Sequence, residues 1–551
     1  MNDSAPVGVF AILLFVLISI AACTDPLPEA PDPEPQVLDE AVATAGQESA
    51  VETDDNPDSP VADAPEGLRW SASPARQPWG GVIAGSWRLA ESNLRSMTRA
   101  IQLEADWCAG DPATAELRAR LRREGEAAAF ASLLQSPLPE TLTWMQTVFS
   151  ATVAARDVAM ADMPDVRFIS RWNLRRWGCV LDDAPAWMRA WGSPELTVSE
   201  ELVQMLGWRH PQMTPRIERQ LSHLYYGGWY DDGKGTVGRI VLVSADPPSA
   251  RSVETLSHEI VHALQDQTLN WNLHEIYESL ETSDQQIAFR WVFEGDSAAT
   301  ELTLADAELS DLAQTIQLGD TSAIGWGATA QARRAREATH WWGLASPYRE
   351  GADVLAGLRQ RHGWRMINGL LREPPDSTEQ VLHLDKFSSD EQPLALVGLE
   401  ALQALVLTPD RWQEPRSDRM GEDWLGSFIH TAARSSEHAV AAAAGWGGDQ
   451  LVLWRSRDDP SRKLITWQIA WDTETEHQQG VEGLVAWLVA QSDSEARWAH
   501  GHRILGWDGA ASAVRLVDTG QSAWLVVAAE IELADQVALA IWSLPAQTYW
   551  Q

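Results

Sequence analysis

Residues 258–262 read HEIVH, and this run constrains the fold more than any other feature of the chain. It lies in a helical pattern from about Ser252 to Asn270. Residues four apart share one face of a helix, so the imidazoles of His258 and His262 can reach one metal ion. Glu259 is rotated by about 100° from His258 and therefore points beside such an ion. The run predicts a metal-binding helix; a surface helix with two unrelated histidines is the alternative.

A catalytic zinc site needs a third protein ligand and one open position. Glu294 is the best candidate, because it lies in a second amphipathic pattern, residues 285–304, with acids on one side. Thr268 stands where the metzincin pattern needs a histidine, which excludes that class. His274 is an alternative ligand. Asp266 is better suited to contact a ligand from behind than to bind the ion itself, since three turns of one helix rarely converge on one ion.

The residues around these positions resemble a family of zinc peptidases. Residues 258–266, HEIVHALQD, are similar to the active-site helix of the gluzincins, the thermolysin-like branch. Residues 291–298, WVFEGDSA, resemble the W-x-x-E-G-x-A helix of the peptidase MA-like gluzincins. The resemblance implies a zincin-type catalytic domain in which His258, His262 and Glu294 bind one Zn²⁺ ion.

The same resemblance implies a reaction and a cleft. Glu259 would be the general base when zinc-bound water attacks a bond of a peptide or protein substrate. Ala298 replaces an aspartate of the family pattern, so Asp296 and Glu301 are candidates for contacts behind the ligands. Zincins have a short edge strand before the metal helix, here within residues 226–243, that pairs with an extended substrate.

Two further residues are candidates for stabilising an oxyanion, as a histidine or tyrosine does in thermolysin-like enzymes. His383 ends the segment 374–383, which looks like a P-x-S-T-E-Q-x-L-H segment of bacterial and archaeal HExxH proteins. Tyr348 lies in the run SPYREG at 346–351. A structural role beside a proline turn is the alternative for both.

The N-terminus is typical of export. Residues 7–22 form an apolar run of 16, about the length of a signal-peptide core and too short to span a bilayer comfortably. The run ends in Ile-Ala-Ala before Cys23, which resembles the lipobox of bacterial lipoproteins, whose cysteine carries a lipid anchor. Residues 1–6 lack the usual Lys or Arg, so an uncleaved anchor or ordinary secretion are alternatives. We expect the protein in the bacterial cell envelope, on a periplasmic or extracellular face.

Acidity dominates the chain. Residues 24–66 hold 13 acidic residues, eight prolines and no Lys or Arg, which predicts a disordered tether. The whole chain has 42 basic and 78 acidic residues, a net charge of −36, which argues against a nucleic-acid partner. In an exported protein Cys108 and Cys179 form an even pair and predict a disulfide. A cysteine nucleophile is the alternative.

The predicted fold is α+β and mostly helical, in several parts. We expect a signal peptide at 1–22, a tether at 23–66, an N-terminal helical region at 67–210, a zincin-like metallopeptidase domain at 211–407 and an α+β module at 408–551. The module shows two strand-strand-helix units, which suggest a small antiparallel sheet covered by helices. Their predicted spans are 450–454, 464–471 and 480–490, then 513–517, 523–529 and 534–543.

Together these features predict a membrane-anchored, extracytoplasmic zinc metallopeptidase. Two alternatives stay open: a catalytically inactive binding or scaffold lipoprotein on a zincin fold, and a zinc hydrolase that acts on a non-peptide bond.

The lipobox resemblance generates a testable prediction. We expect the mature protein to begin at a lipidated Cys23 and to partition with membranes, whereas Cys23→Ser should remain unlipidated. Mass spectrometry of the N-terminal peptide measures both. Wild-type protein that starts elsewhere and carries no acyl chain would contradict the prediction.

Overall fold

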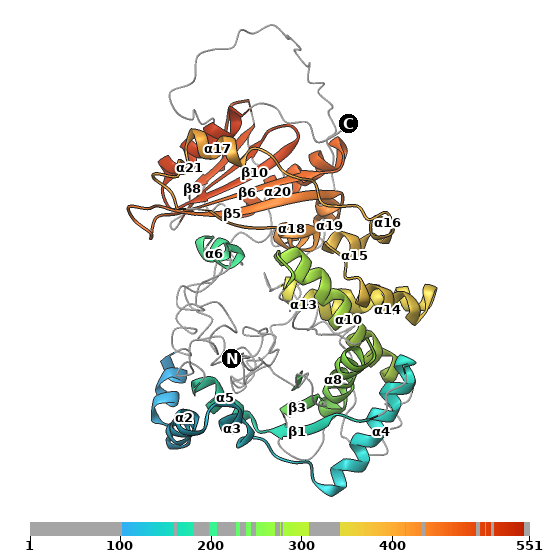
Figure 1. Cartoon of the computed structure of the whole chain (residues 1–551). Coiled ribbons are helices and arrows are strands. Elements are labelled where there is room, and N and C mark those ends of the chain that lie inside the picture. Colours follow the sequence, from blue (N-terminus) through green and yellow to red (C-terminus); the bar gives the residue numbers. More distant parts are fainter. Residues whose placement is uncertain are drawn as a thin grey trace, which may run out of the picture.

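The computed structural model describes residues 102–158, 162–180, 198–206, 228–231, 238–243, 250–269, 276, 279–307, 342–413, 415–430, 436–491, 496–501, 503–508 and 512–544. Cys23, the predicted signal peptide and the predicted tether lie outside these residues. In the described part helices predominate and strands form two sheets, which confirms a mostly helical α+β fold (Figure 1). None of the helices described is long and apolar enough to cross a bilayer.

The smaller sheet joins distant parts of the sequence. Its strand order is β1-β3-β2, with β1 parallel and β2 antiparallel to the central strand. The strands are β1 (Asp165–Ile169), β2 (Gly228–Asp231) and β3 (Arg239–Val243). Residues on both sides of the boundary expected at 210 therefore share one sheet.

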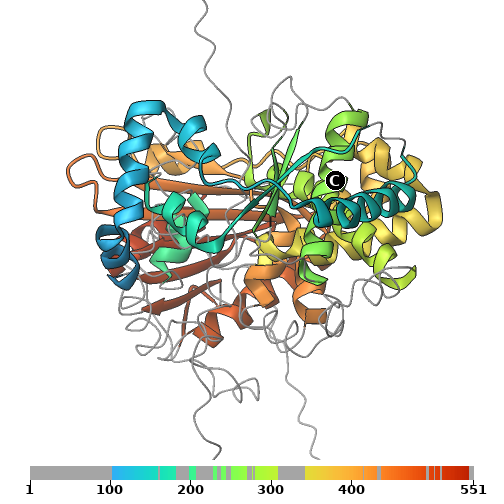
Figure 2. The same ribbon diagram turned by 90° about the horizontal axis from the view of Figure 1, so that it is seen from below.

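Helices cover both faces of this sheet. Side chains alternate along a strand, so successive residues of β3 contact different helices. Ile240 and Leu242 of β3 meet α4 and α8 on one face. Val241 and Val243 meet α2, α3 and α5 on the other, and Figure 2 shows the blue and teal helices on either side of the green strands. The five helices are α2 (Pro112–Glu124), α3 (Glu126–Ala131), α4 (Pro139–Arg156), α5 (Arg171–Val180) and α8 (Ala250–Leu269).

The disulfide between Cys108 and Cys179 is confirmed. The Cα atoms of the two residues lie 5.5 Å apart, within the usual range for a disulfide. The bond joins a helical residue before α2 to the last turn of α5. A bonded cysteine is no thiol nucleophile, so that alternative is excluded.

The larger sheet has seven antiparallel strands in the order β4-β5-β6-β10-β9-β8-β7. Both of its faces are buried: in β10 Leu525 faces one helical layer, whereas Trp524 and Val526 face the other. The strands are β4 (Arg416–Asp418), β5 (Trp446–Arg455), β6 (Lys463–Trp471), β7 (Arg497–Ala499), β8 (Ile504–Asp508), β9 (Ala513–Asp518) and β10 (Ser522–Ala528).

Three helices from the C-terminal half, together with α6 from the N-terminal region, contribute to the core on one face of this sheet. Two helices cover the opposite face. The first group is α6 (Val198–Met205), α18 (Gly421–His430), α19 (Ser436–Ala443) and α20 (Glu474–Gln491), and the second is α17 (Leu399–Leu405) and α21 (Ile531–Trp542).

Sequence and structure differ in the C-terminal half in the number of strands. The predicted strands and helices correspond to β5, β6, α20, β9, β10 and α21; only the spans 523–529 and 534–543 each extend one residue past the observed element. Pairing of β6 with β10 makes one continuous sheet. The sequence does not predict β4, β7 or β8. The first two have three residues each, and Gly506 interrupts the third, so no apolar alternation marks them.

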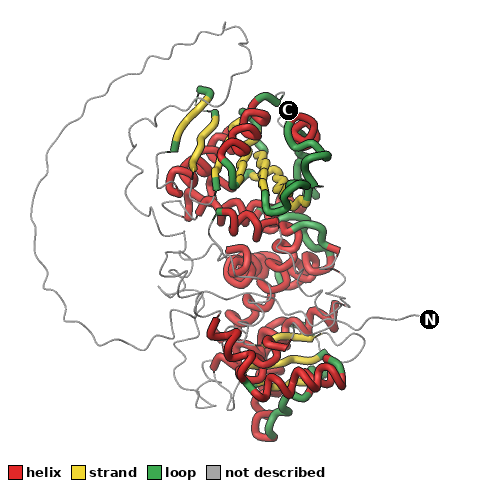
Figure 3. The backbone as a smooth tube through the Cα atoms, turned by 90° about the vertical axis from the view of Figure 1, so that its left-hand side faces the viewer, coloured by secondary structure: helices red, strands yellow, loops and turns green. Residues whose placement is uncertain are grey.

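A helical layer lies between the two sheets (Figure 3). Its members are α10 (Ser283–Ala307), α13 (Trp342–His362), α14 (Trp364–Arg372), α15 (Thr378–Leu382) and α16 (Leu384–Ser388). The first turn of α10 is bonded to the C-terminal half. Ser283 N donates to Asp418 Oδ1 at 2.8 Å. The carboxylate of Asp284 pairs with Arg419 Nε at 3.0 Å and accepts from Thr378 N at 2.8 Å.

The junction of α18 with the larger sheet depends on Asp449. Its Oδ1 accepts from Met420 N at 2.9 Å and Trp467 Nε1 at 3.1 Å. Its Oδ2 accepts from Gly421 N at 2.8 Å and Trp446 Nε1 at 2.9 Å. Four buried N–H groups thus converge on one carboxylate, which satisfies all of them.

We expect Asp449→Asn to lower the free energy of unfolding by about 3–5 kcal/mol, because the amide turns an N–H₂ group toward these donors and removes the charge. Chemical denaturation measures the change. Asp458→Asn, at an exposed site, is the control and should stay within about 0.5 kcal/mol of wild type. Equal stability of the two variants would contradict this account.

Candidate metal centre

The helix α8 presents the two histidines side by side. His258 and His262 are one turn apart, and their ring centroids lie 4.7 Å apart in an edge-to-face arrangement. The apolar residues Leu256, Ile260 and Ala263 occupy the opposite side of α8 and pack in the core beneath the smaller sheet. Burial of that side orients the histidines toward α10.

Glu294 of α10 lies between the histidines. Its Oε2 is 3.1 Å from His258 Nε2 and 3.4 Å from His262 Nε2, and the residue is 1% exposed. Ligand atoms of the three residues all lie within 4.8 Å of one another. Ligands bound about 2.0–2.1 Å from one tetrahedral ion are about 3.3 Å apart, so the spacing suits zinc.

The second nitrogen of each histidine is already engaged. His258 Nδ1 lies 2.6 Å from Glu301 Oε1, and His262 Nδ1 lies 2.9 Å from Gln265 Oε1. Acceptors at Nδ1 fix the proton there and leave the lone pair of Nε2 for a metal. Glu294 Oε1 is buried and has no hydrogen-bond partner among the residues that the structure describes. This set of donor atoms fits a divalent ion such as zinc.

A buried chain of contacts supports His262 from behind. Gln265 Nε2 donates to Asp296 Oδ2 at 2.9 Å, and Asp296 Oδ1 pairs with Arg156 Nε of α4 at 2.9 Å. Arg156 Nη2 also donates to Asn368 Oδ1 of α14 at 2.6 Å. Four segments of the chain therefore meet behind this imidazole.

The sequence anticipates part of this support. Of the two acids named as candidates, Glu301 contacts His258 directly, whereas Asp296 reaches His262 through Gln265. Gln265 itself is missed, although it stands three residues after His262, on the same side of the helix. Arg156 is missed because nothing in the sequence relates α4 to the metal helix.

Close approach of α10 to α13 sets the depth of Glu294. A Cβ atom on Gly295 would lie 2.7 Å from the carbonyl carbon of Gly351. A Cβ atom on Gly351 would lie 2.8 Å from the carbonyl oxygen of Trp291. Neither backbone leaves room for a side chain, so glycine at both positions permits the contact.

Glu259 is buried next to the candidate metal-binding group, which consists of His258, His262 and Glu294. Burial raises its pKa above the ordinary value, against the opposing charges of His258 and His262. Burial would also raise the pKa of Glu294, but hydrogen bonds to the histidines outweigh it and hold that pKa well below the usual range. Burial lowers the pKa of His258, but the charge of Glu301 and the bond to Glu294 raise it well above normal. These directions describe the protein without a metal ion.

Other predicted residues lie elsewhere. His383, between α15 and α16, places Nε2 3.0 Å from Glu422 Oε2 of α18 and is not part of the group formed by His258, His262 and Glu294. This bond raises the pKa of His383. Asp266 accepts from Tyr230 Oη at 2.6 Å. The side chain of Tyr348, on α13, and residue His274 lie outside the described part.

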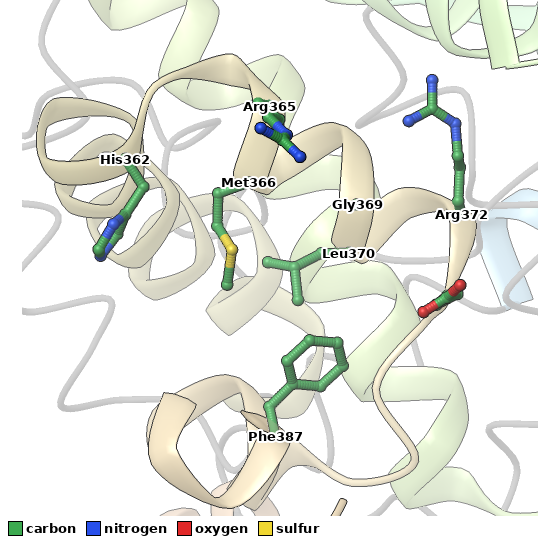
Figure 4. A pocket seen from close by; sticks show the side chains of 8 residues that line it. His362, Arg365, Met366, Gly369, Leu370, Arg372 and Phe387 are labelled. Atoms are coloured by element: carbon green, nitrogen blue, oxygen red, sulfur yellow. The ribbon is translucent and has the colours of Figure 1, made fainter. Parts of the chain in front are cut away.

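A separate hollow of about 430 Å³ lies beside α14 (Figure 4). Arg365 and Arg372 stand at its rim, and Met366, Leu370 and Phe387 form its apolar wall. None of the residues that line it belongs to the metal-binding group.

Comparison with known proteins reaches only the C-terminal half. Residues 407–538 match a family model described as a domain of unknown function, DUF8575. This segment spans the whole larger sheet and most of α21, and excludes the metal-binding residues. No curated protein and no solved structure matches the chain.

The contact between Glu301 and His258 generates a prediction. We expect Glu301→Leu to weaken zinc binding about 10–100-fold, because His258 Nδ1 loses its acceptor. Competition with a chelator of known affinity measures the change. Glu301→Gln keeps an acceptor oxygen and should retain most of the affinity; equal affinity of Glu301→Leu and wild type would refute the role.

Proposed function

We propose that this protein is a zinc-dependent metallopeptidase of the gluzincin type, exported and held at the bacterial envelope by a lipid on Cys23. One observation carries the proposal: the Nε2 atoms of His258 and His262 and the carboxylate of Glu294 meet at one point from two helices. The acceptors behind both Nδ1 atoms add support, because metal-binding histidines need such partners.

The surroundings of this group support a zincin-type arrangement. A strand, the HExxH helix and a second helix with the glutamate follow one another as β3, α8 and α10. β2 lies at one end of the three-stranded order, beside α8 in space. A strand in that position suits backbone pairing with an extended peptide.

The chemistry divides among the chain's own residues. His258, His262 and Glu294 would hold zinc, while Glu301 and Gln265 keep the imidazoles oriented. Zinc, when bound, lowers the pKa of a water molecule and polarises a carbonyl oxygen. Glu259, adjacent to the ligands and buried, would take a proton from the attacking water and donate it to the leaving amine.

Export receives independent support from the disulfide. The bond between Cys108 and Cys179 suits an oxidising compartment, where disulfides persist. A lipid-anchored enzyme of the envelope would meet peptides or proteins on that side of the membrane. The chain's net charge of −36 disfavours nucleic acid as a partner, because nucleic acid is itself negatively charged.

Substitutions separate metal binding from catalysis. We expect His258→Ala, His262→Ala and Glu294→Ala to lose zinc, because each removes one of three protein ligands. Glu259→Gln should keep zinc yet lower peptide hydrolysis by at least about 100-fold, since it removes the base alone. Metal quantification and digestion of a peptide library measure the two properties.

The control is His362→Ala, which alters an exposed histidine of α13 and should change neither property. Full activity of Glu259→Gln would contradict the general-base role. Zinc binding without hydrolysis of any peptide would favour the scaffold or the non-peptide hydrolase instead.

A further inference from the structure

Arg290 is a buried cation without a partner in the part of the chain that the structure describes. It lies on α10 and is 7% exposed. Its Nε and Nη2 atoms are buried and form no hydrogen bond. A guanidinium stays charged at every accessible pH, so the side chain cannot avoid this cost by losing a proton.

Two other buried arginines of the chain are paired. Arg156 pairs with Asp296, and Arg515 pairs with Asp508 and Asp535. An unpaired buried charge costs several kcal/mol, which a protein tolerates where function requires it. Arg290 therefore indicates a place for an anion that is not part of the folded chain.

The position of Arg290 relates that anion to the metal-binding group. Arg290 precedes Glu294 by four residues and lies on the same face of α10. Four residues separate their Cα atoms by about 6 Å along the helix axis, and helical side chains lean toward the N-terminus. An extended peptide advances about 3.3 Å per residue. The spacing of Arg290 and Glu294 along α10 therefore corresponds to about two residues of an extended substrate.

The charges around the candidate metal ligands indicate which class of anion Arg290 binds. The other ionisable side chains around the metal ligands include the acids Glu259 and Glu301, which repel a negatively charged substrate. The planar fork of a guanidinium binds a carboxylate through two parallel hydrogen bonds. Arg290 can offset the repulsion at one point of the cleft.

We propose that Arg290 binds a substrate carboxylate located one or two residues from the scissile bond. The carboxylate is either the free C-terminus of a short peptide or the side chain of Asp or Glu. This inference rests on the proposed peptidase function and names its substrate class.

Binding to the metal-free, full-length protein tests the inference without any turnover. The probes are three N-acetylated peptides of one length: one with a free C-terminus, its C-terminal amide, and an amide that carries Glu in place of Gln near the end. We expect at least one carboxylate peptide to bind about tenfold or more tightly than its neutral match, by calorimetry. The free-acid and Glu peptides distinguish the two sources.

Substitutions assign that preference to Arg290. Arg290→Met should reduce it to about twofold or less, and Arg290→Lys should retain part of it, because the charge remains while the fork is lost. Arg365→Met, at an exposed arginine of α14, is the control and should keep the full preference. In the zinc-loaded protein Arg290→Met should raise KM with kcat little changed.

The outcomes separate this inference from the function on which it rests. Equal binding of charged and neutral peptides by wild-type protein overturns the role of Arg290, even if Arg290→Met does not fold. A preference that survives in folded Arg290→Met overturns it as well. If the protein hydrolyses only neutral peptides, the peptidase function is supported and the role of Arg290 is not. If the protein prefers carboxylate peptides but hydrolyses none, the proposed peptidase function is contradicted instead.

Discussion

Burial of the Glu294 carboxylate is the constraint on which the rest of the structure depends. A charge that is 1% exposed is stable only with compensating partners, and two imidazole nitrogens within 3.4 Å provide them. The helix pair α8 and α10 must therefore cross with little tolerance. The acceptors behind the histidines then decide which nitrogen faces the carboxylate, so the group has the donor atoms and the orientation of a metal-binding site.

That crossing is maintained by segments from the whole chain. Arg156, from α4, supports His262 through Asp296 and Gln265. Gly351 lets α13 approach α10 at the residue next to Glu294. At the other end of α10, bonds from its first turn to residues 418 and 419 connect it to the segment that matches DUF8575. The C-terminal half therefore helps to position the helix that carries Glu294.

Prediction from sequence succeeded where periodicity is local. The pattern at 252–270 corresponds to α8 and the pattern at 285–304 to α10, because apolar residues recur at helical spacing within each segment. Prediction failed where a single residue, or a partner distant in the sequence, determines the local structure. Gly125, with φ of 84°, separates α2 from α3 within the helical region predicted at 67–210. β1 pairs with β3 across more than 70 residues, which no local pattern records.

The sequence by itself determined that His258 and His262 lie one turn apart, because helical spacing needs no tertiary contact. It also indicated Glu294 as the third member of the group and the pairing of Cys108 with Cys179. Only the tertiary structure decided which partners surround them. Its packing places Glu301 and Gln265 beside the imidazoles and His383 beside Glu422, and it gives Arg290 no partner among the described residues. Such contacts depend on how helices cross, and crossing is set by side chains far apart in the chain.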